Sequence, residues 1–497
     1  MFLVVFIARE NRRKIAFRKF NEIEKKALLI IFFKIMSLKI YNTLSKKKEF
    51  FKPLSSKKVR LFVCGPTVYN FSHIGHARTC IVFDSFVKYL RQNNYQVFYL
   101  QNITNVDDKI LNQAKKEKIS WEKLALKFEK EYLKDMENLK VDSVTKYARA
   151  TDYIKEIISQ IERLMAKGYA YETRDGIYYD ISKFKNYGKL SKRTVLQAED
   201  AVSRIDESKG KKNKGDFCLW KKSKQGEPKW KSPWFLGRPG WHIEDTAIVE
   251  KHFGPQYDIH GGARDLIFPH HEAEIAQMEA VSGKKPMVKY WLHTGFLTVN
   301  GDKMAKSKSN FIFIKDSLKK HSYRSLRFFI LKSHYRLPVD YREEAIFQAE
   351  NGIKRIDEFL EKIKNLSLIK DKKKSLKITK DFEKEFKTAL NDDFNTPRAI
   401  SVIFKLIKKG NSLIDKNKLT GAEAKEILNF FKKVDEVFNF FFEEKQEIPQ
   451  EILALAKQRE EARRKLQWEK SDKIREKINK LGYNIEDTKD GFHLRRV

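Results

Sequence analysis

The sequence feature that most constrains the fold is a pair of short motifs that lie more than 200 positions apart. The first, residues 73–76, reads His-Ile-Gly-His and follows an apolar run at 61–63 and a Gly-Pro turn. Apolar residues recur at helical spacing after it, so we expect the motif where a buried strand passes into a helix N-terminus. Such a helix end binds phosphate through its free N–H groups and its dipole. Two imidazoles there, His73 and His76, can donate to an oligophosphate whose charge grows during a reaction.

The second motif, residues 303–307, reads Lys-Met-Ala-Lys-Ser and follows an Asn-Gly turn after a strand-like run at 295–299. It places Lys303 and Lys306 three positions apart, which suits the clamping of a leaving pyrophosphate. Each motif alone is a weak signal, because a His-x-x-His is more often a surface turn or a core pair and lysine is abundant in this chain. Their joint occurrence, each after a strand pattern, favours a functional interpretation.

Further segments around and between the motifs narrow the interpretation; they are residues 64–69, 103–109, 237–244 and 258–274. Together they resemble the motifs of class I aminoacyl-tRNA synthetases, with Ala305 in place of the usual middle serine of the second motif. Within that class they are similar to the cysteinyl-tRNA synthetases, from about residue 36 to residue 497. The resemblance implies ATP-dependent activation of L-cysteine to cysteinyl-adenylate. It also implies transfer to the 3′ end of tRNA(Cys), with release of AMP and pyrophosphate.

The resemblance also implies roles for individual residues. The catalytic residues would be His73, His76, Lys303 and Lys306, and these would bind ATP together with Gly75 and Ser307. Glycine at position 75 would let the backbone approach the nucleotide closely, and Mg²⁺ is expected to accompany ATP. The residues expected to bind the substrate are Thr67, Trp241, His242, His260 and Asp265.

A metal site is expected because the enzyme must distinguish cysteine from the almost isosteric serine, which a pocket shape does poorly. A thiolate binds Zn²⁺ strongly and a neutral hydroxyl does not. The resemblance implies one Zn²⁺ per chain, which takes the substrate sulfur as an added ligand. Three family ligands carry over to Cys64, His270 and Glu274, and the His/Glu spacing of four places both on one helix face.

The fourth family ligand is a thiolate, and its position holds Asp245. Carboxylate oxygen is a normal zinc ligand, so a Cys/Asp/His/Glu site is our expectation. Two alternatives stay open: the site has lost zinc and recognises cysteine in another way, or Cys218 supplies a replacement thiolate. Cys80 is expected in the core.

The expected fold is an α/β Rossmann-type parallel-sheet catalytic domain that is split by an inserted domain. A helical bundle and a small C-terminal module on the anticodon side follow it. The expected parts are an N-terminal extension at 1–35, the first catalytic half at 36–140, an inserted connective domain and linker at 141–215, the second catalytic half at 216–300, the second-motif loop and stem-contact region at 301–341, a tRNA-binding helical bundle at 342–444 and an anticodon-binding module at 445–497.

Within these parts, the sequence predicts a strand at 216–220 that resumes the parallel sheet, and helices at 316–333 and 451–480. The candidates for contacts with RNA phosphates and bases in the C-terminal region are Arg459, Arg463, Arg464, Trp468, Arg475, Arg495 and Arg496. A solvated surface is the alternative for the helix residues. The extension at 1–35 is either an upstream start or a transit peptide. Its apolar runs are too short to span a bilayer, so no membrane partner is expected.

Composition agrees with this interpretation. The formal net charge of +36 points to a polyanionic partner such as RNA, although a solvated basic surface would give the same number. Three cysteines without paired spacing indicate a reducing, cytoplasmic location. We also expect a monomer.

Two rival functions agree with only part of the sequence. A ligase that transfers cysteine to an amino sugar would lack the long region after Tyr341. A non-enzymatic RNA-binding paralogue would not need the histidines and lysines of the two motifs.

Overall fold

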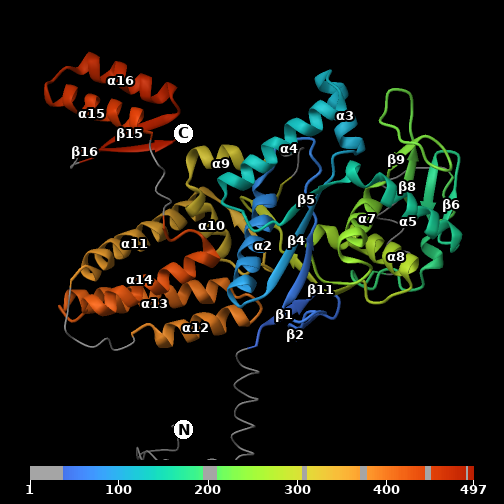
Figure 1. The fold of residues 1–497 in the computed structure, drawn as a ribbon, viewed down its shortest axis with the longest axis horizontal. Coiled ribbons are helices and arrows are strands. Elements are labelled where there is room, and N and C mark those ends of the chain that lie inside the picture. Colours follow the sequence, from blue (N-terminus) through green and yellow to red (C-terminus); the bar gives the residue numbers. More distant parts are fainter. Residues whose placement is uncertain are drawn as a thin grey trace, which may run out of the picture.

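The computed structural model describes residues 37–193, 210–304, 310–369, 378–442, 449–488 and 491–496 (Figure 1). The predicted extension at 1–35 and the predicted ATP-binding residues Lys306 and Ser307 lie outside these ranges.

A parallel five-stranded sheet forms the centre of the catalytic domain. Its strands, in order across the sheet, are β11 (Val288–Thr294), β10 (Tyr257–Ala263), β3 (Lys58–Val63), β4 (Gln96–Ile103) and β5 (Lys146–Arg149). The chain runs outward from β3 to β5 and later returns to add β10 and β11 on the other side. The strand order therefore reverses between β3 and β10, and in such sheets a ligand crevice forms at the carboxyl ends of the strands at this point. The predicted fold class is confirmed.

Helices connect and cover these strands. The helices of this domain are α2 (Ile74–Gln92), α3 (Asp108–Glu117), α4 (Trp121–Asn138), α7 (Trp241–Phe253) and α8 (His270–Ser282). The N-terminal hairpin of β1 (Lys39–Asn42) and β2 (Lys47–Phe50) packs at the β11 edge, where the backbone N–H of Thr43 donates to Trp291.

The inserted domain is an antiparallel sheet. Its elements are η1 (Ala150–Tyr153), α5 (Ile154–Ala166), β6 (Ala170–Glu172), β7 (Gly176–Tyr179), η2 (Ile181–Lys183), β8 (Phe217–Lys222) and β9 (Gly237–Pro239). The prediction that a strand at 216–220 resumes the parallel sheet is wrong, because β8 pairs antiparallel with β7 and β9. Phe217 stacks on Tyr179 at 4.9 Å between ring centroids, so aromatic packing holds β8 in the inserted sheet.

A small three-stranded sheet brackets the second motif in the sequence, and its strand β13 contains Lys303. It consists of β12 (Leu297–Val299), β13 (Asp302–Lys303) and β14 (Val339–Tyr341). Asn300 and Gly301 have φ values of 51° and 83°, which is the left-handed pair that a tight two-residue hairpin turn requires. The helix predicted at 316–333 is two helices, α9 (Ile314–Lys320) and α10 (Tyr323–Leu331), because Ser322 begins a new helix by capping Ser325 N.

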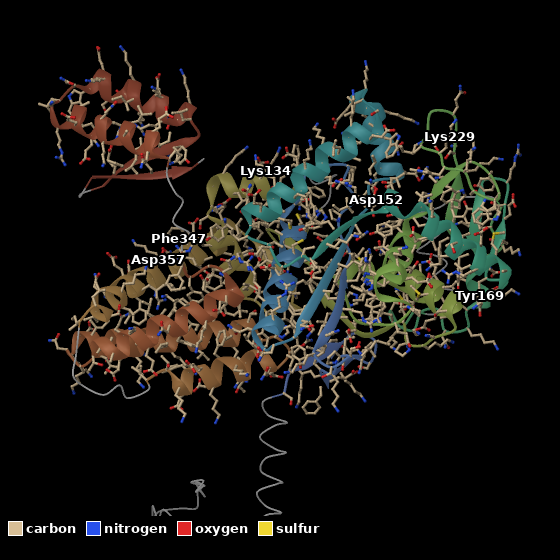
Figure 2. The ribbon with its side chains drawn as sticks, in the orientation of Figure 1. Lys134, Asp152, Tyr169, Lys229, Phe347 and Asp357 are labelled. Atoms are coloured by element: carbon tan, nitrogen blue, oxygen red, sulfur yellow. The ribbon has the colours of Figure 1, made fainter. Side chains whose placement is uncertain are left out.

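The helical bundle packs directly against the catalytic domain. Its helices are α11 (Glu343–Ser367), α12 (Lys380–Asn391), α13 (Thr396–Asp415) and α14 (Gly421–Phe438). Phe86 of α2 contacts Phe394 at 5.4 Å between centroids, so one hydrophobic core crosses the boundary between the two parts. Arg324 of α10 and Asp357 of α11, which is labelled in Figure 2, form an ion pair that joins the bundle to the helix preceding it.

The C-terminal module has a core of its own. Its elements are α15 (Gln450–Arg464), α16 (Trp468–Lys480), β15 (Tyr483–Thr488) and β16 (Gly491–Arg496). The single helix predicted at 451–480 is therefore two helices, because Leu466 adopts a left-handed φ of 56° between them. Among the described residues, no helix has the length and apolar character that crossing a membrane would need.

Candidate active site

A cavity of about 660 Å³ opens at the carboxyl ends of the central strands. The predicted site residues that line it are Cys64, Thr67, His73, Gly75, His76, Trp241, Asp265 and Lys303. His242 and His260 were predicted to contact the substrate, but both are buried behind the cavity wall. The structure therefore brings the phosphate motifs together around one cavity, and it places two of the predicted substrate contacts in a deeper layer.

The first motif forms the N-terminus of α2, as predicted. His73 is the N-cap residue, and its Nδ1 accepts from Gly75 N at 3.1 Å. His76 Nδ1 accepts from His73 N at 3.3 Å, and the two rings stack at 3.8 Å between centroids. Burial lowers the pKa of His73 to about 4, and burial together with His73 lowers the pKa of His76 well below its usual value. Both imidazoles are therefore neutral at pH 7, and because each Nδ1 is an acceptor, each carries its proton on Nε2.

Gly75 is required by close packing at this turn. A Cβ atom built on it would lie 2.9 Å from the His73 ring and 3.1 Å from Met304 Cε. A side chain here would displace the ring of the N-cap histidine and the end of the Met304 side chain. The glycine thus leaves room for both side chains at the start of α2.

Lys303 and Lys109 place positive charge at the cavity. Lys303 ends β13 at the cavity wall, with its Nζ 5.2 Å from the centroid of the Phe296 ring. Lys109 also lines the cavity, and its Nζ lies 5.8 Å from the ring centroids of both Tyr69 and Trp241. No role was predicted for Lys109, although it ends the segment 103–109 that contributed to the family resemblance.

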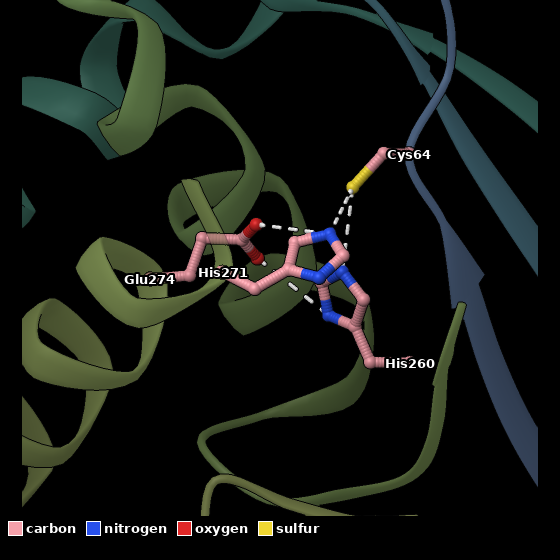
Figure 3. Close-up of side chains that lie close together, drawn as sticks. All are labelled: Cys64, His260, His271 and Glu274. Atoms are coloured by element: carbon pink, nitrogen blue, oxygen red, sulfur yellow. Dashed lines mark hydrogen bonds and ion pairs between the residues drawn. The ribbon is translucent and has the colours of Figure 1, made fainter. Parts of the chain in front are cut away.

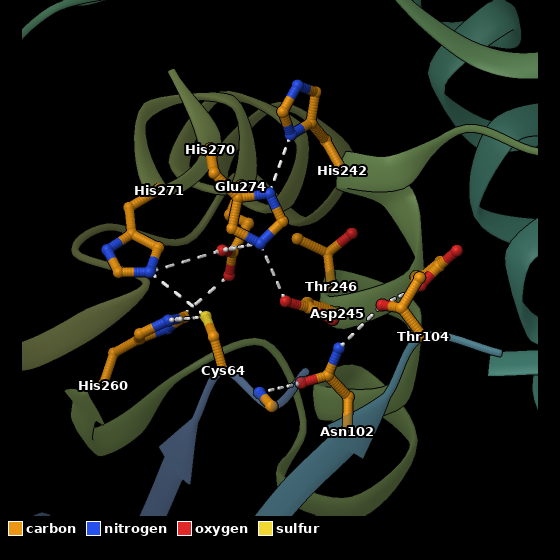
Figure 4. A network of polar contacts seen from close by, with 12 residues as sticks. Cys64, Asn102, Thr104, His242, Asp245, Thr246, His260, His270, His271 and Glu274 are labelled. Carbon is orange, nitrogen blue, oxygen red and sulfur yellow. Dashed lines mark hydrogen bonds and ion pairs between the residues drawn. The ribbon is translucent and has the colours of Figure 1, made fainter. Parts of the chain in front are cut away.

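Behind Cys64 lies a buried cluster of metal-binding side chains (Figure 4). Cys64 follows β3, Asp245 belongs to the first turns of α7, and His270 and Glu274 lie on one face of α8. One donor atom from each of the four lies within 4.8 Å of the others. His270 Nε2 is 2.9 Å from Asp245 Oδ2 and 3.2 Å from Glu274 Oε1. The structure therefore gathers the four predicted zinc ligands, Asp245 included.

The state of these donors fits a cation. Asp245 Oδ1 and both carboxylate oxygens of Glu274 are buried and accept no hydrogen bond. Burial and the neighbouring Asp245 raise the pKa of Glu274, while burial, Glu274 and Asp245 raise the pKa of the Cys64 thiol. Buried acidic groups that lack donors are costly unless a positive charge is shared between them, and a divalent metal ion would supply that charge.

A second donor set overlaps the first and consists of Cys64, His260, His271 and Glu274 (Figure 3). Cys64 Sγ is 3.1 Å from His271 Nε2 and 3.3 Å from His260 Nε2. The other ring nitrogens are also held, since His271 Nδ1 is 2.8 Å from His293 Nε2 and His260 Nδ1 is 2.6 Å from the Tyr257 hydroxyl. His271 was not predicted as a site residue, and its only signal was its place beside His270.

Neither donor set contains Cys218. Cys218 lies in β8 of the inserted sheet, so the structure lends no support to a replacement thiolate from this residue. Cys80 is buried, as predicted, and burial raises its pKa to about 11.

Comparisons with known proteins agree with this geometry. Residues 50–351 match the family described as tRNA synthetases class I (C) catalytic domain, residues 385–443 match the DALR domain, and residues 445–495 match the cysteinyl-tRNA ligase anticodon binding domain. A cysteine–tRNA ligase of Thermococcus gammatolerans is 44% identical over 478 residues, which are 93% of this chain and 100% of that protein. One of Methanococcus maripaludis is 43% identical over 479 residues, which are 93% of this chain and 99% of that protein.

A solved structure shows the same fold at much lower identity. Mycobacterium tuberculosis methionyl-tRNA synthetase in complex with methionyl-adenylate has a TM-score of 0.58 at 14% identity, over 76% of this chain and 89% of that chain. The parallel sheet, the helix-capping histidines and the catalytic-domain match define a class I aminoacyl-tRNA synthetase. Within that class, the chain belongs to the cysteine–tRNA ligase family. This family is in general zinc-dependent, and the cluster around Cys64 is a possible metal site.

Proposed function

We propose that this chain activates L-cysteine and transfers it to tRNA(Cys) in the cavity between the two motifs. One observation carries the residue assignment: His73, His76 and Lys303 line the same cavity as Cys64, the nearest member of the donor cluster. Phosphate-binding groups and a thiol-recognition site thus meet in one space. The ligase activity itself follows from family membership.

In the first step, a carboxylate oxygen of cysteine attacks the α-phosphorus of ATP. The bond between that phosphorus and the bridging oxygen breaks, and pyrophosphate leaves. The neutral Nε2–H groups of His73 and His76 donate to phosphate oxygens as their charge grows, and they need no reorganisation because backbone hydrogen bonds already hold the rings. Lys303 stabilises the leaving pyrophosphate, and we assign the same role to Lys306. Mg²⁺ would accompany ATP.

In the second step, a hydroxyl of the terminal ribose of tRNA(Cys) attacks the carbonyl carbon of cysteinyl-adenylate, and AMP leaves. Trp241 stacks on His270 at 4.4 Å between centroids, so it separates the cavity from the donor cluster at this point. We place Thr67, Trp241 and Asp265 in contact with the substrate. His242 and His260 support the cluster from behind the wall.

Cys64, Asp245, His270 and Glu274 would hold the Zn²⁺, one per chain. When bound, the ion accepts a thiolate and not a neutral hydroxyl, which separates cysteine from serine. With one protein thiolate in place of two, this donor set is richer in oxygen than the family pattern.

For tRNA, we assign the helical bundle to the body of the molecule and the C-terminal module to the anticodon. Trp468 is 55% exposed and available for stacking on a base. Arg459 is not available for phosphate, because it is buried and bonds Asp487 at 2.7 Å.

A cytoplasmic location and a monomeric state complete the proposal, and the three free cysteines are consistent with a reducing compartment.

Metal analysis of the purified protein tests this assignment. We expect close to one zinc per chain in the wild type, a lower content and weaker cysteine binding in Asp245→Ala, and retention of both in Asp245→Cys. A fully active preparation without stoichiometric metal would contradict the zinc site and leave Asp245 as a direct contact to cysteine or a structural residue. Cysteine-dependent ATP–pyrophosphate exchange, measured on the same samples, tests the activation step separately.

A further inference from the structure

Cys64 follows β3, whereas Asp245 lies in α7. A chain of three hydrogen bonds connects their neighbours in the sequence, Gly65 and Glu244 (Figure 4). Gly65 N–H donates to Asn102 Oδ1 at 2.6 Å, and Asn102 Nδ2 donates to Thr104 Oγ1 at 3.3 Å. Thr104 Oγ1 then donates to Glu244 Oε2 at 2.8 Å. We call Asn102, Thr104 and Glu244 the Thr104 bridge.

The Thr104 bridge has little freedom to move. Its three side chains are at most 2% exposed. A Cβ atom on Gly65 would lie 1.8 Å from the Asn102 carbonyl oxygen, so the loop after Cys64 is pressed against the end of β4. The Thr104 backbone also bonds this loop, since its N–H donates to Pro66 and its carbonyl accepts from Val68, each at 3.1 Å.

We propose that Asn102, Thr104 and Glu244 are positioning residues that hold Cys64 and Asp245 at a fixed separation. The inference rests on the proposed metal site. Zinc donors must lie close to set distances from the ion, and here two of the four come from separate elements that the bridge connects. Thr104 is the central member, because its single hydroxyl accepts from Asn102 and donates to Glu244.

The reason for such a bridge is the position of Cys64 in a loop. The two donors on α8 are held by the regular backbone of one helix, whereas Cys64 follows the last residue of β3. Loss of hydrogen bonds that orient metal ligands typically lowers metal affinity or activity by about 10- to 100-fold. The Thr104 hydroxyl should therefore influence metal retention and cysteine recognition, although Thr104 is neither a proposed zinc ligand nor part of the cavity lining.

Three variants of the full-length zinc-loaded protein test the inference. Thr104→Val keeps the shape of the side chain and removes the hydroxyl, while Thr104→Ser keeps the hydroxyl. Thr246→Val is the matched control, because Thr246 is also a buried threonine, on α7 next to Asp245, and its hydroxyl donates to Gln160 at 2.6 Å on the side of α5. The measurements are the rate at which a colorimetric chelator removes zinc and the KM values for cysteine and for ATP in pyrophosphate exchange.

We expect Thr104→Val to release zinc about tenfold faster or more and to raise the KM for cysteine by a similar factor, with the KM for ATP unchanged. Thr104→Ser should restore both values, and Thr246→Val should resemble the wild type. Equal behaviour of Thr104→Val and Thr246→Val, or no rescue by Thr104→Ser, would overturn the inference. A zinc-free wild-type protein would instead overturn the proposed metal site. The positioning role of the bridge would then stand only if Thr104→Val raises the KM for cysteine and not the KM for ATP, and if Thr104→Ser reverses that change.

Discussion

At the scale of the residue, the two histidines of the first motif act as neutral donors. Their Nδ1 atoms are occupied by backbone N–H groups, and burial keeps the rings uncharged. Their contribution to phosphate transfer is therefore an oriented N–H dipole and not a full positive charge, which in this cavity comes from lysines.

The first prediction concerns His76. We expect His76→Ala to lose about 2–4 kcal/mol of transition-state stabilisation in adenylate formation, the scale of one preorganised donor. His76→Asn should lose less, because an amide can also donate without charge. The measurement is cysteine-dependent ATP–pyrophosphate exchange, and the KM for cysteine should change little. Exchange rates of His76→Ala near those of the wild type would refute the assignment.

The second prediction is a pH dependence. Because burial lowers the pKa of His73 to about 4, the active neutral form is already present at pH 6 and stays present as the pH rises. Protonation should remove activity only as the pH falls toward 4. The exchange rate of the wild type at saturating substrates should therefore show no loss due to these histidines between about pH 6 and 8. The opposite result would be an exchange rate that decreases as the pH rises through 6.5, together with the loss of this pH dependence in His73→Asn. That result would show that the imidazolium is required.

At the scale of the elements, one arginine joins helices that are far apart in the sequence. Arg327 of α10 is fully buried and bonds Asp84 of α2 at 2.7 Å and the carbonyl oxygen of Phe438, at the end of α14, at 2.8 Å. Burial alone would raise the pKa of Asp84, but the charges of Arg327 and Lys88 outweigh it and hold that pKa below its usual value. The contact unites the phosphate-binding helix and the bundle.

The third prediction follows from this contact. Arg327→Met should lower the free energy of unfolding by about 3–5 kcal/mol, because it removes one partner of a buried ion pair and leaves Lys88 as the remaining cation beside Asp84. The control is Lys405→Ala, which breaks an exposed ion pair with Glu385 and should change stability by about 1 kcal/mol or less. The two variants are compared by chemical denaturation. Equal effects would mean that Arg327 contributes no more than a surface charge.

At the scale of the whole molecule, the C-terminal module is separate in its packing from the catalytic domain. Its hydrophobic core consists of its own residues, among them Leu455, Ile478 and Ile485. The bundle, in contrast, shares its core with α2 and the sheet. The reaction with ATP therefore depends on the catalytic domain and the bundle, and the module can be removed without opening that core.

The fourth prediction is a deletion of residues 445–497. We expect cysteine-dependent ATP–pyrophosphate exchange to remain largely intact and aminoacylation of tRNA(Cys) to be severely reduced. Activation needs only the cavity, whereas charging needs the tRNA to be held. Equal loss of both activities would show that the module supports the structure of the catalytic domain.

The sequence by itself determined the local elements and the identity of the family. The apolar run before His73, the helical spacing after it and the Asn300–Gly301 turn each define a structure within a few residues, so β3, α2 and the turn that ends β12 could be predicted. The same short segments carry the ATP chemistry, because one strand end and one helix cap suffice to build a phosphate site.

Only the tertiary structure decided which elements meet. A strand pattern shows that β8 is buried but not which strand pairs with it, and so the sheet of β8 was predicted wrongly. The same limit applies to His260 and His271, because nothing in their local sequence says that both lie against Cys64 Sγ. The bond between Thr104 and Glu244 and the bond between Arg327 and Asp84 each join residues more than 100 positions apart, which only the packed chain brings within hydrogen-bond distance.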